Sequence, residues 1–260
     1  MNGPQVFRHP IGAFERSLRK AYDRAMRSVG RVPYTARAQG ARFIVDTDDL
    51  IDRELAINAI WEATQLEDFA GLCKRHRIDY FLDIGANAGV YSVLLANKNL
   101  GGEIIAFEPD PGNRARLQAN IAANGLQKKI QVIANAVGDR NAEVTLMEAG
   151  RHNRGESWIA HPDKPPEEAA GVATHVVRQI CFDDVFAIAG KNILVKMDVE
   201  GSEFHALAGM ERTLRDNNCY LQVELYSDRF EELKSLFARL GYRYLKTDYI
   251  DHYFTNFPDL

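Results

Sequence analysis

The sequence has few cysteines, and none has the spacing of a disulfide framework or a zinc site. Its 260 residues include only Cys73, Cys181 and Cys219, an odd number at wide intervals without a CxxC motif. Such usage is typical of a reducing compartment, where an isolated cysteine is more often a small buried hydrophobe than a nucleophile. We therefore expect a cytoplasmic protein without a structural disulfide or zinc ion.

Long apolar runs and a strong net charge are also missing. No stretch approaches the ~18 consecutive apolar residues of a transmembrane helix, and the N-terminus lacks the apolar core of a signal peptide. A net charge of −4 and an isoelectric point near 6.0 give no overall attraction to nucleic acid. The 46% hydrophobic content suffices for one sizeable core.

The first 45 residues are basic, although the chain as a whole is not. They hold nine lysines and arginines against two acids, so this segment carries +7 and the remainder −11 of the total −4. Apolar residues recur here at helical spacing over 10–29, at Ile11, Phe14, Leu18, Tyr22, Met26 and Val29. Such a helix either packs on the protein's own core with a solvated basic side, or rests on the inner face of an anionic membrane or on an acidic partner. We divide the chain into a helical extension, 1–45, and a domain, 46–260.

The remaining pattern predicts an α/β domain. A helical stretch is expected over about 49–77, capped by Thr47 or Asp48. From residue 80 short apolar runs alternate with helical patterns, which is typical of βαβ units around a parallel sheet. The expected strands are 80–84, 103–107, 130–134, 193–197 and 220–225. The expected helices are 90–97, 111–124, 182–189, 202–215 and 229–240. Residues 143–147 are predicted as a hairpin strand, and 242–245 with 249–255 as an antiparallel pair.

The segment FLDIGANAGVYS, residues 81–92, joins the first of these strands to its helix. Gly85 and Gly89 let the backbone turn tightly and approach a ligand, and the helix start offers unpaired N–H groups. A dinucleotide pyrophosphate requires glycine at the third position of GxGxxG, where this chain has Asn87. The spacing DxGxxxG suits S-adenosylmethionine better: Asp83 can meet the ligand ammonium while the loop, including Ala86, packs on the adenosyl group.

Two further turns extend the expected adenosyl site. Glu108, followed by Pro109, ends the second strand, where a carboxylate can accept hydrogen bonds from ribose hydroxyls of either S-adenosylmethionine or NAD. Asn135 and Ala136 follow the third strand, beside the position expected for an adenine ring. The neighbouring Gly138 could equally mark an ordinary turn.

An acidic cluster follows the fourth strand, in ILVKMDVEGSEFHAL, residues 193–207. Alternation puts Lys196 and Asp198 on one side of this strand, and parallel strands line a ligand crevice with their carboxyl ends. Asp198 should therefore border the cofactor. Glu224 ends the fifth strand similarly, so the two carboxylates could meet, one acting as a base or both holding Mg²⁺. The candidate catalytic residues are Asp198, Glu224, Lys196 and His205, with Asp198 the first choice and His205 more often structural in such a position.

The acceptor side is less defined by the sequence. Residues 150–179 form an irregular stretch that is long for a compact domain, and such loops are often lids or binding loops. Arg154, Ser157 and Trp158 could contact an acceptor, for example a sugar face on the tryptophan ring, and Glu200 is a further acceptor contact. An insertion without a role is an equal alternative.

Taken in order, DIGANAGVYS, FEPDP, NAVGD, KMDVEGSE and VEL resemble the FkbM family of S-adenosylmethionine-dependent methyltransferases, over about 46–257. KMDVEGSE is the most specific block; the upstream DTDDLIDRELAINAIWE matches less closely, because the family has a glycine near Asn58. The resemblance implies a seven-stranded class I methyltransferase fold whose last two strands form a reversed hairpin. It also implies that the cofactor is held by Asp83, Gly85, Asn87, Gly89 and Glu108.

The same resemblance implies O-methylation of a sugar hydroxyl in a glycolipid or polysaccharide precursor, or of a natural product. Methyl transfer from a sulfonium has a good leaving group, so positioning and a base for the hydroxyl are the main requirements. Three alternatives remain open at this point: an N-methyltransferase acting on a small amine, a nucleotide-cofactor oxidoreductase, and a non-catalytic membrane-associated protein that binds the cofactor.

Overall fold

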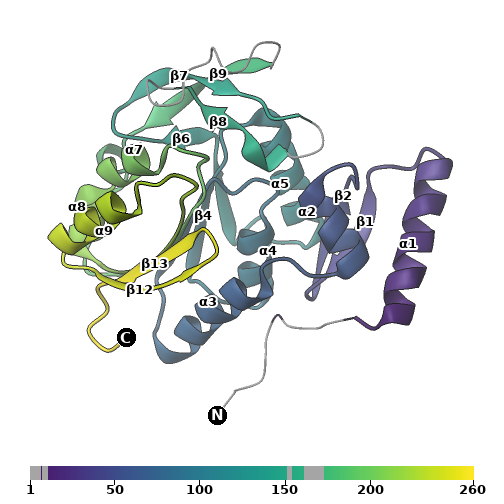
Figure 1. The fold of residues 1–260 in the computed structure, drawn as a ribbon, viewed down its shortest axis with the longest axis horizontal. Helices are drawn as coiled ribbons and strands as arrows, with labels where there is room; N and C mark the ends of the chain where they lie inside the picture. The colour runs from purple at the N-terminus through teal and green to yellow at the C-terminus, as the bar shows by residue number, and fades with distance from the viewer. Residues whose placement is uncertain (1–6, 8–10, 151–153, 161–172) are drawn as a thin grey trace.

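The central feature of the protein is a seven-stranded sheet. The structure is a computed structural model that describes residues 7, 11–150, 154–160 and 173–260 (Figure 1). The strand order is β12-β13-β11-β10-β3-β4-β5. Its members are β3 (Tyr80–Ile84), β4 (Glu103–Phe107), β5 (Ile130–Ile133), β10 (Asn192–Met197), β11 (Asn218–Glu224), β12 (Arg243–Asp248) and β13 (Asp251–Thr255). The first five strands are parallel, and β12 and β13 form the antiparallel hairpin that the sequence predicts.

Helices cover both faces of this sheet, because successive side chains of its parallel strands point to opposite sides and most are apolar. One face packs on α3 (Ala63–Arg75), α4 (Val90–Asn97) and α5 (Pro111–Ala123). The other packs on α6 (Phe182–Val185), α7 (Glu203–Ala208), α8 (Glu211–Asp216) and α9 (Phe230–Arg239). Phe81 and Leu82, neighbours on β3, enter the two different cores. The Rossmann-like three-layer arrangement is confirmed.

A second, four-stranded sheet lies across one end of the first (Figure 1). Its order is β6-β9-β7-β8, formed by β6 (Asn135–Val137), β9 (Thr174–Ile180), β7 (Ala142–Met147) and β8 (Trp158–Ile159). The strand expected over 130–134 is confirmed as β5, and the chain passes from it directly into β6, which the sequence did not predict. The described parts of 150–179 are not irregular either, because they hold β8, β9 and the 3₁₀ turn η2 (Arg154–Glu156).

Two predicted helices are divided in the structure. The stretch 49–77 forms α2 (Leu50–Arg53), the π-helical turn η1 (Glu54–Asn58), which follows α2 directly, and α3. Between η1 and α3, Ala59 and Glu62 adopt the left-handed conformation. Asp49, rather than Thr47 or Asp48, caps α2 by accepting from the Asp52 N–H. The stretch 202–215 breaks between α7 and α8 at Gly209, where a Cβ would lie 1.9 Å from the Gly138 carbonyl oxygen.

The N-terminal segment adds a hairpin that the sequence analysis missed, β1 (Tyr34–Ala38) and β2 (Ala41–Val45). Their burial alternates along each strand, with β2 lying against α5. The expected first helix is α1 (Ala13–Ser28), at the outer edge of the molecule (Figure 1). Of the two alternatives for this helix, packing of its apolar side on the protein's own core is wrong, because Phe14, Leu18 and Tyr22 face solvent. No helix in the described ranges is both long and apolar enough to cross a bilayer.

Candidate active site

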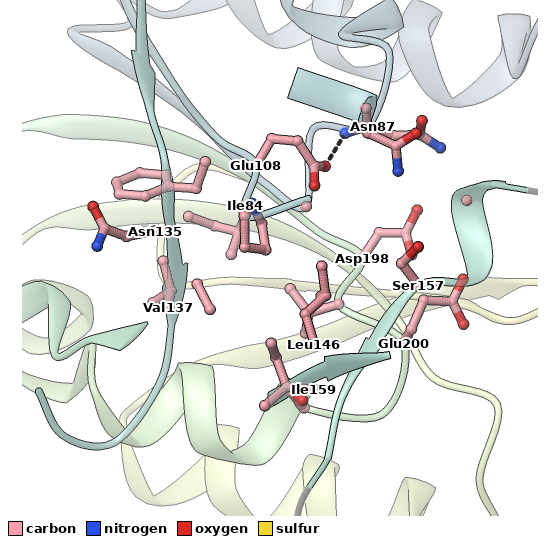
Figure 2. A pocket seen from close by; sticks show the side chains of 18 residues that line it. Ile84, Asn87, Glu108, Asn135, Val137, Leu146, Ser157, Ile159, Asp198 and Glu200 are labelled. Carbon is pink, nitrogen blue, oxygen red and sulfur yellow. Dashed lines mark hydrogen bonds between the residues drawn. The ribbon is translucent and has the colours of Figure 1, made fainter. Parts of the chain in front are cut away.

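A cavity lies at the carboxyl ends of β3 and β4, beneath the small sheet. Its wall includes Gly85, Asn87, Glu108 and Asp198 from the large sheet and Leu146 from β7 (Figure 2). The fold places it where open α/β sheets bind ligands, beyond the ends of parallel strands. The sequence predicted the wall that follows the strands of the large sheet and, of the small sheet, only Asn135 and Ala136; Leu146 and Ile159 were not predicted.

The glycine turn is held against the loop after β10. Gly85 has φ +82°, and a Cβ there would lie 1.7 Å from the Asp198 carbonyl oxygen, so only glycine fits. Asn87, at φ +50°, occupies a left-handed position that asparagine tolerates. Gly89 does not line the cavity; a Cβ on it would lie 2.1 Å from Leu117 Cδ1, so it serves the packing of α4 on α5.

Glu108 projects into the cavity from the end of β4 (Figure 2). Its carboxylate accepts from the backbone N–H groups of Asn87, at 2.7 Å, and Asp110, at 2.8 Å. Burial raises the pKa of Glu108 to about 8, although these two hydrogen bonds favour the ionised form. A ligand hydroxyl that donates to this carboxylate would stabilise its charge further. Pro109, next to it, also lines the cavity.

The opposite part of the cavity suits a flat apolar ring. Asn135 and Ala136, both predicted, lie here together with Val137, Leu146 and Ile159 (Figure 2). Two buried polar atoms of this cavity have no hydrogen-bond partner among the described residues, Asn87 Oδ1 and the hydroxyl of Ser202, which is 5% exposed. Buried polar atoms without partners are rare in folded proteins, and in a cavity wall they mark ligand contacts.

Asp83 was predicted to contact the ligand ammonium directly, but its side chain is buried more deeply than such a contact requires. It is 1% exposed and accepts from Ser92 N at 3.2 Å and Ser92 Oγ at 2.6 Å. Burial raises its pKa, against the nearby positive charge of Lys196. With Ala86 it borders a second, smaller cavity that shares Gly85, Asn87 and Asp198 with the first. Asp83 thus braces the start of α4 and contributes negative charge to that smaller cavity.

Acidic side chains form a row across the sheet beside these cavities. Lys196 pairs in register with Asp83 on one side and Gln222 on the other. Two residues further along the same face, the register brings Asp198 beside Glu224, and Glu224 opposite Asp251. We call Asp198, Glu224 and Asp251 the acidic row. The sequence predicted its first two members; β13 was too weakly patterned to show that Asp251 joins them.

Lys196 supplies an internal counter-charge to this row. Its ammonium lies 2.8 Å from Asp198 Oδ2 and 5.1 Å from the centre of the Tyr91 ring. Burial opposes the charge, yet the carboxylates of Asp198, Glu62 and Glu224 raise the pKa of Lys196 well above the ordinary lysine range. The pKa of Glu224 rises to about 8, first because of burial and then because of the charge on Asp198.

Other predicted site residues lie apart from the cavities or serve their walls. His205 Nδ1 lies 3.2 Å from Asp139 Oδ2, on the far part of α7, and borders neither cavity. Arg154 does not reach into the cavity, because its guanidinium lies 2.9 Å from Asp46 Oδ2. Ser157 borders the cavity, with its hydroxyl 3.2 Å from Asp110 Oδ2. Trp158 lies on β8 outside the lining, while Glu200, at φ +52°, is part of it.

Sequence reasoning missed the residues of the smaller cavity that come from before β3. Trp61 and Glu62 lie there with Tyr91, whose hydroxyl donates to the Glu62 carboxylate. Burial raises the pKa of Glu62. The left-handed backbone of Glu62, at φ +38°, turns its side chain toward α4, and a helical pattern running through this position gave no sign of that break.

Comparison with protein families places this site in context. A model described as the methyltransferase FkbM domain matches residues 83–244, more than half of the chain. The chain belongs to the FkbM family of S-adenosylmethionine-dependent methyltransferases. The match begins at Asp83 and includes Glu108 and the acidic row up to Glu224. It leaves out α1, the β1–β2 hairpin and Glu62.

Three solved structures to which this chain is similar are named as methyltransferases or methylases. The methyltransferase FkbM from Methylobacillus flagellatus KT is 20% identical with a TM-score of 0.44, over 68% of this chain and 43% of that one. A putative RNA methyltransferase from Pyrococcus horikoshii is 12% identical with a TM-score of 0.42, over 75% and 83%. A ribosomal protein L11 methylase from Lactobacillus delbrueckii subsp. bulgaricus is 10% identical with a TM-score of 0.42, over 75% and 79%. The chain spans less than half the length of the first of these. Curated proteins give no match.

Proposed function

We propose that this FkbM protein transfers a methyl group from S-adenosylmethionine to a hydroxyl of an uncharged acceptor: a sugar, a glycolipid or polysaccharide precursor, or a natural product. The acidic row beside the cofactor cavity carries this proposal. The row and its surroundings hold six carboxylates around the Lys196 ammonium. They come from Glu62, Asp83, Asp198, Glu200, Glu224 and Asp251.

The cavity residues fit the parts of S-adenosylmethionine. Glu108 is placed to accept from ribose hydroxyls, and the apolar wall of Val137, Leu146 and Ile159 suits an adenine ring. The adjoining smaller cavity, with Glu62 and Asp83, suits an ammonium group. When bound, the cofactor supplies a methyl group on a positively charged sulfur, and the acidic row favours that charge.

The negative charge of the acidic row also limits which acceptors can bind. An acceptor that carries phosphates, such as RNA, would bring negative charge against Asp198, Glu224 and Asp251, and like charges at short range disfavour binding. A neutral polyhydroxylated acceptor meets no such repulsion, and carboxylates are good acceptors for its hydroxyl protons. An amine acceptor is the second candidate, because the same row would stabilise an ammonium group.

Glu224 has the pKa best suited to taking the hydroxyl proton, and it lies beside Asp198, which borders both cavities. A general base works most efficiently when its pKa lies near the working pH, and the pKa of Glu224 is raised to about 8 by burial and by Asp198. Asp198, the first choice from the sequence, is engaged by the Lys196 ammonium at 2.8 Å. In this proposal Asp198 and Lys196 position the acceptor and set the pKa of Glu224. The small sheet excludes water from the cavity.

A divalent cation is a second way to activate the hydroxyl. Asp198, Glu200 and Glu224 can each offer one carboxylate oxygen within 4.8 Å of the others, and carboxylates are suitable Mg²⁺ ligands. The ammonium of Lys196 already neutralises Asp198, so we propose a metal-independent reaction. Activity that disappears in EDTA and returns with Mg²⁺ would instead assign the base role to a metal-bound group.

The direct test uses labelled S-adenosylmethionine and a cell extract divided into lipid, glycan, small-molecule and RNA fractions. We expect label in a glycan, glycolipid or small-molecule fraction with the wild-type protein. Glu224→Gln is the matched control; it should bind S-adenosylhomocysteine normally and transfer little label. Label confined to RNA would refute the proposed acceptor class. Stabilisation by NADH rather than S-adenosylhomocysteine would favour an oxidoreductase, and cofactor binding without transfer to any fraction would favour a non-catalytic protein.

A further inference from the structure

Helix α1 is docked on the protein by its charged side. Asp23 is its one buried residue and accepts from the hydroxyls of Tyr34, at 3.0 Å, and Thr47, at 2.6 Å. Arg19 donates to the carbonyl oxygens of Arg37, at 2.9 Å, and Ala56, at 3.2 Å. Arg27 donates to Thr47 and Asp48. The polar contacts therefore fix which side of the helix faces the body.

This orientation leaves the apolar side of α1 in solvent. Phe14 is 78% exposed, Leu18 55%, Tyr22 52% and Val29 65%. Spacings of four and seven residues put these side chains on one side of the helix. An ordinary surface helix would bury such a stripe, so its exposure here marks a contact surface.

Basic side chains occupy other exposed sides of the same helix. Arg16, Lys20 and Arg24 are exposed on α1 and take part in no ion pair among the described residues. The exposed Arg37 and Arg42 are directly opposite each other on β1 and β2. Like charges at such a cross-strand position destabilise a hairpin unless an anion lies between them.

The helix and the hairpin form one surface. A groove between them is bordered by Leu18 and Tyr22 from α1 and by Arg37 from β1. Arg37 also borders a second hollow, with Arg42 and the amides of Asn97 and Asn124. The one acid of these two linings, Glu15, is 3.0 Å from Arg19. The surface therefore combines an apolar stripe with positive charge.

We propose that α1 and the β1–β2 hairpin bind this protein peripherally to an anionic lipid bilayer. An apolar stripe on a helix whose polar side is rich in lysine and arginine is the composition of helices that lie in the plane of a membrane interface. Phe14 and Leu18 would enter the acyl boundary, and the arginines would contact lipid phosphates. A second copy of the chain fits less well, because two such surfaces would bring the same positive charge together.

The test is sedimentation of the full chain with vesicles of phosphatidylcholine alone or of phosphatidylcholine mixed with phosphatidylglycerol, an anionic lipid. Binding is expected only to the anionic vesicles and should weaken at high salt. The double substitution Phe14→Ser/Leu18→Ser and the triple substitution Arg16→Gln/Lys20→Gln/Arg24→Gln should each reduce the partition coefficient at least ~tenfold.

Matched controls lie away from this surface. Val176→Ser, at a side chain 73% exposed on β9, and Lys191→Gln, at an exposed lysine, should leave vesicle binding unchanged. All variants should keep wild-type affinity for S-adenosylhomocysteine, which separates this proposal from the proposed function. Equal binding to neutral and anionic vesicles, or none to either, would overturn it. Self-association in light scattering that the Phe14→Ser/Leu18→Ser variant abolishes would assign the surface to a second copy.

Discussion

At the scale of single residues, the proposed chemistry depends on which carboxylate the Lys196 ammonium contacts. It contacts Asp198 at 2.8 Å and neutralises one member of the acidic row, while Glu224 stays protonated below about pH 8 because it is buried beside Asp198. The two carboxylates are therefore unequal although both end parallel strands. In the proposed function this inequality makes Glu224 the base and Asp198 the residue that raises its pKa, and it gives two predictions.

The first prediction concerns pH. A carboxylate base acts only when deprotonated, so kcat/KM should rise with pH and level off above about pH 8, the pKa of Glu224. Glu224→Gln should lower kcat/KM at least ~10²-fold and remove this rise. Initial rates from pH 6 to 9.5 measure both effects. A rise of unchanged midpoint in Glu224→Gln would assign the titration to another group.

The second prediction separates Asp198 from Glu224. The substitution Asp198→Asn removes a negative charge beside Glu224 and should shift the midpoint of the pH profile below that of the wild type. The rate should fall as well, because Lys196 loses its partner. If Asp198 is itself the base, the variant will instead lose at least ~10²-fold at every pH and show no shifted midpoint.

The sequence alone predicted the site residues that follow the carboxyl ends of strands. Alternation and the glycine turn predicted that Gly85, Glu108 and Asp198 share one crevice, and the structure brings them together. It could not predict Ser202 or Ile159, because their place in the wall depends on how the small sheet lies over the large one. Glu62 was hidden by a helical pattern that continues across a left-handed turn.

At the scale of elements, the small sheet and η2 act as the cover of the cavity. Arg154 fastens η2 through its ion pair with Asp46 and through its N–H, which donates to Asp49 at 3.1 Å. Asn113 of α5 donates to the Arg154 carbonyl at 2.9 Å. The cover is thus attached to both the N-terminal segment and α5. The sequence left a lid, a binding loop and an insertion without a role open here. It offered Arg154 as an acceptor contact, because a charge partner 108 residues away is not visible in a pattern.

The cover gives the third prediction. Arg154→Ala removes a half-buried ion pair, so the affinity for S-adenosylhomocysteine should fall about five- to tenfold, mainly through faster dissociation. Calorimetry and stopped-flow fluorescence measure the two quantities. Arg140→Ala is the control, since that exposed arginine pairs only with its neighbour Asp139. Equal effects of the two substitutions would show that η2 is not a cover.

The fourth prediction concerns the glycine turn. Gly85→Ala places a Cβ 1.7 Å from the Asp198 carbonyl oxygen, so the turn and the loop after β10 must separate. Gly125→Ala is a matched control, because Gly125 has a similar positive φ, +68°, but open space around it. We expect Gly125→Ala to cost about 1 kcal/mol of unfolding free energy and Gly85→Ala more than twice that. Urea denaturation compares them, and equal costs would contradict the close approach.

At the scale of the whole molecule, two regions of opposite charge support the two proposals. The region that matches the FkbM family carries Asp198 and Glu224 of the acidic row, on which the proposed acceptor class rests, while the N-terminal segment is basic. Composition revealed this division, but not which side of α1 is free. A hydrophobic pattern predicts that an apolar side is buried; in this protein Asp23, Arg19 and Arg27 make the contacts instead.

The measurement that tests the central claim most directly is a crystal structure with S-adenosylhomocysteine. The account predicts that the ribose hydroxyls contact Glu108, that the adenine lies between Val137, Leu146 and Ile159, and that the sulfur faces the acidic row at Asp198 and Glu224. A cavity that stays empty under saturating ligand, or a bound ligand whose sulfur points away from that row, would contradict it.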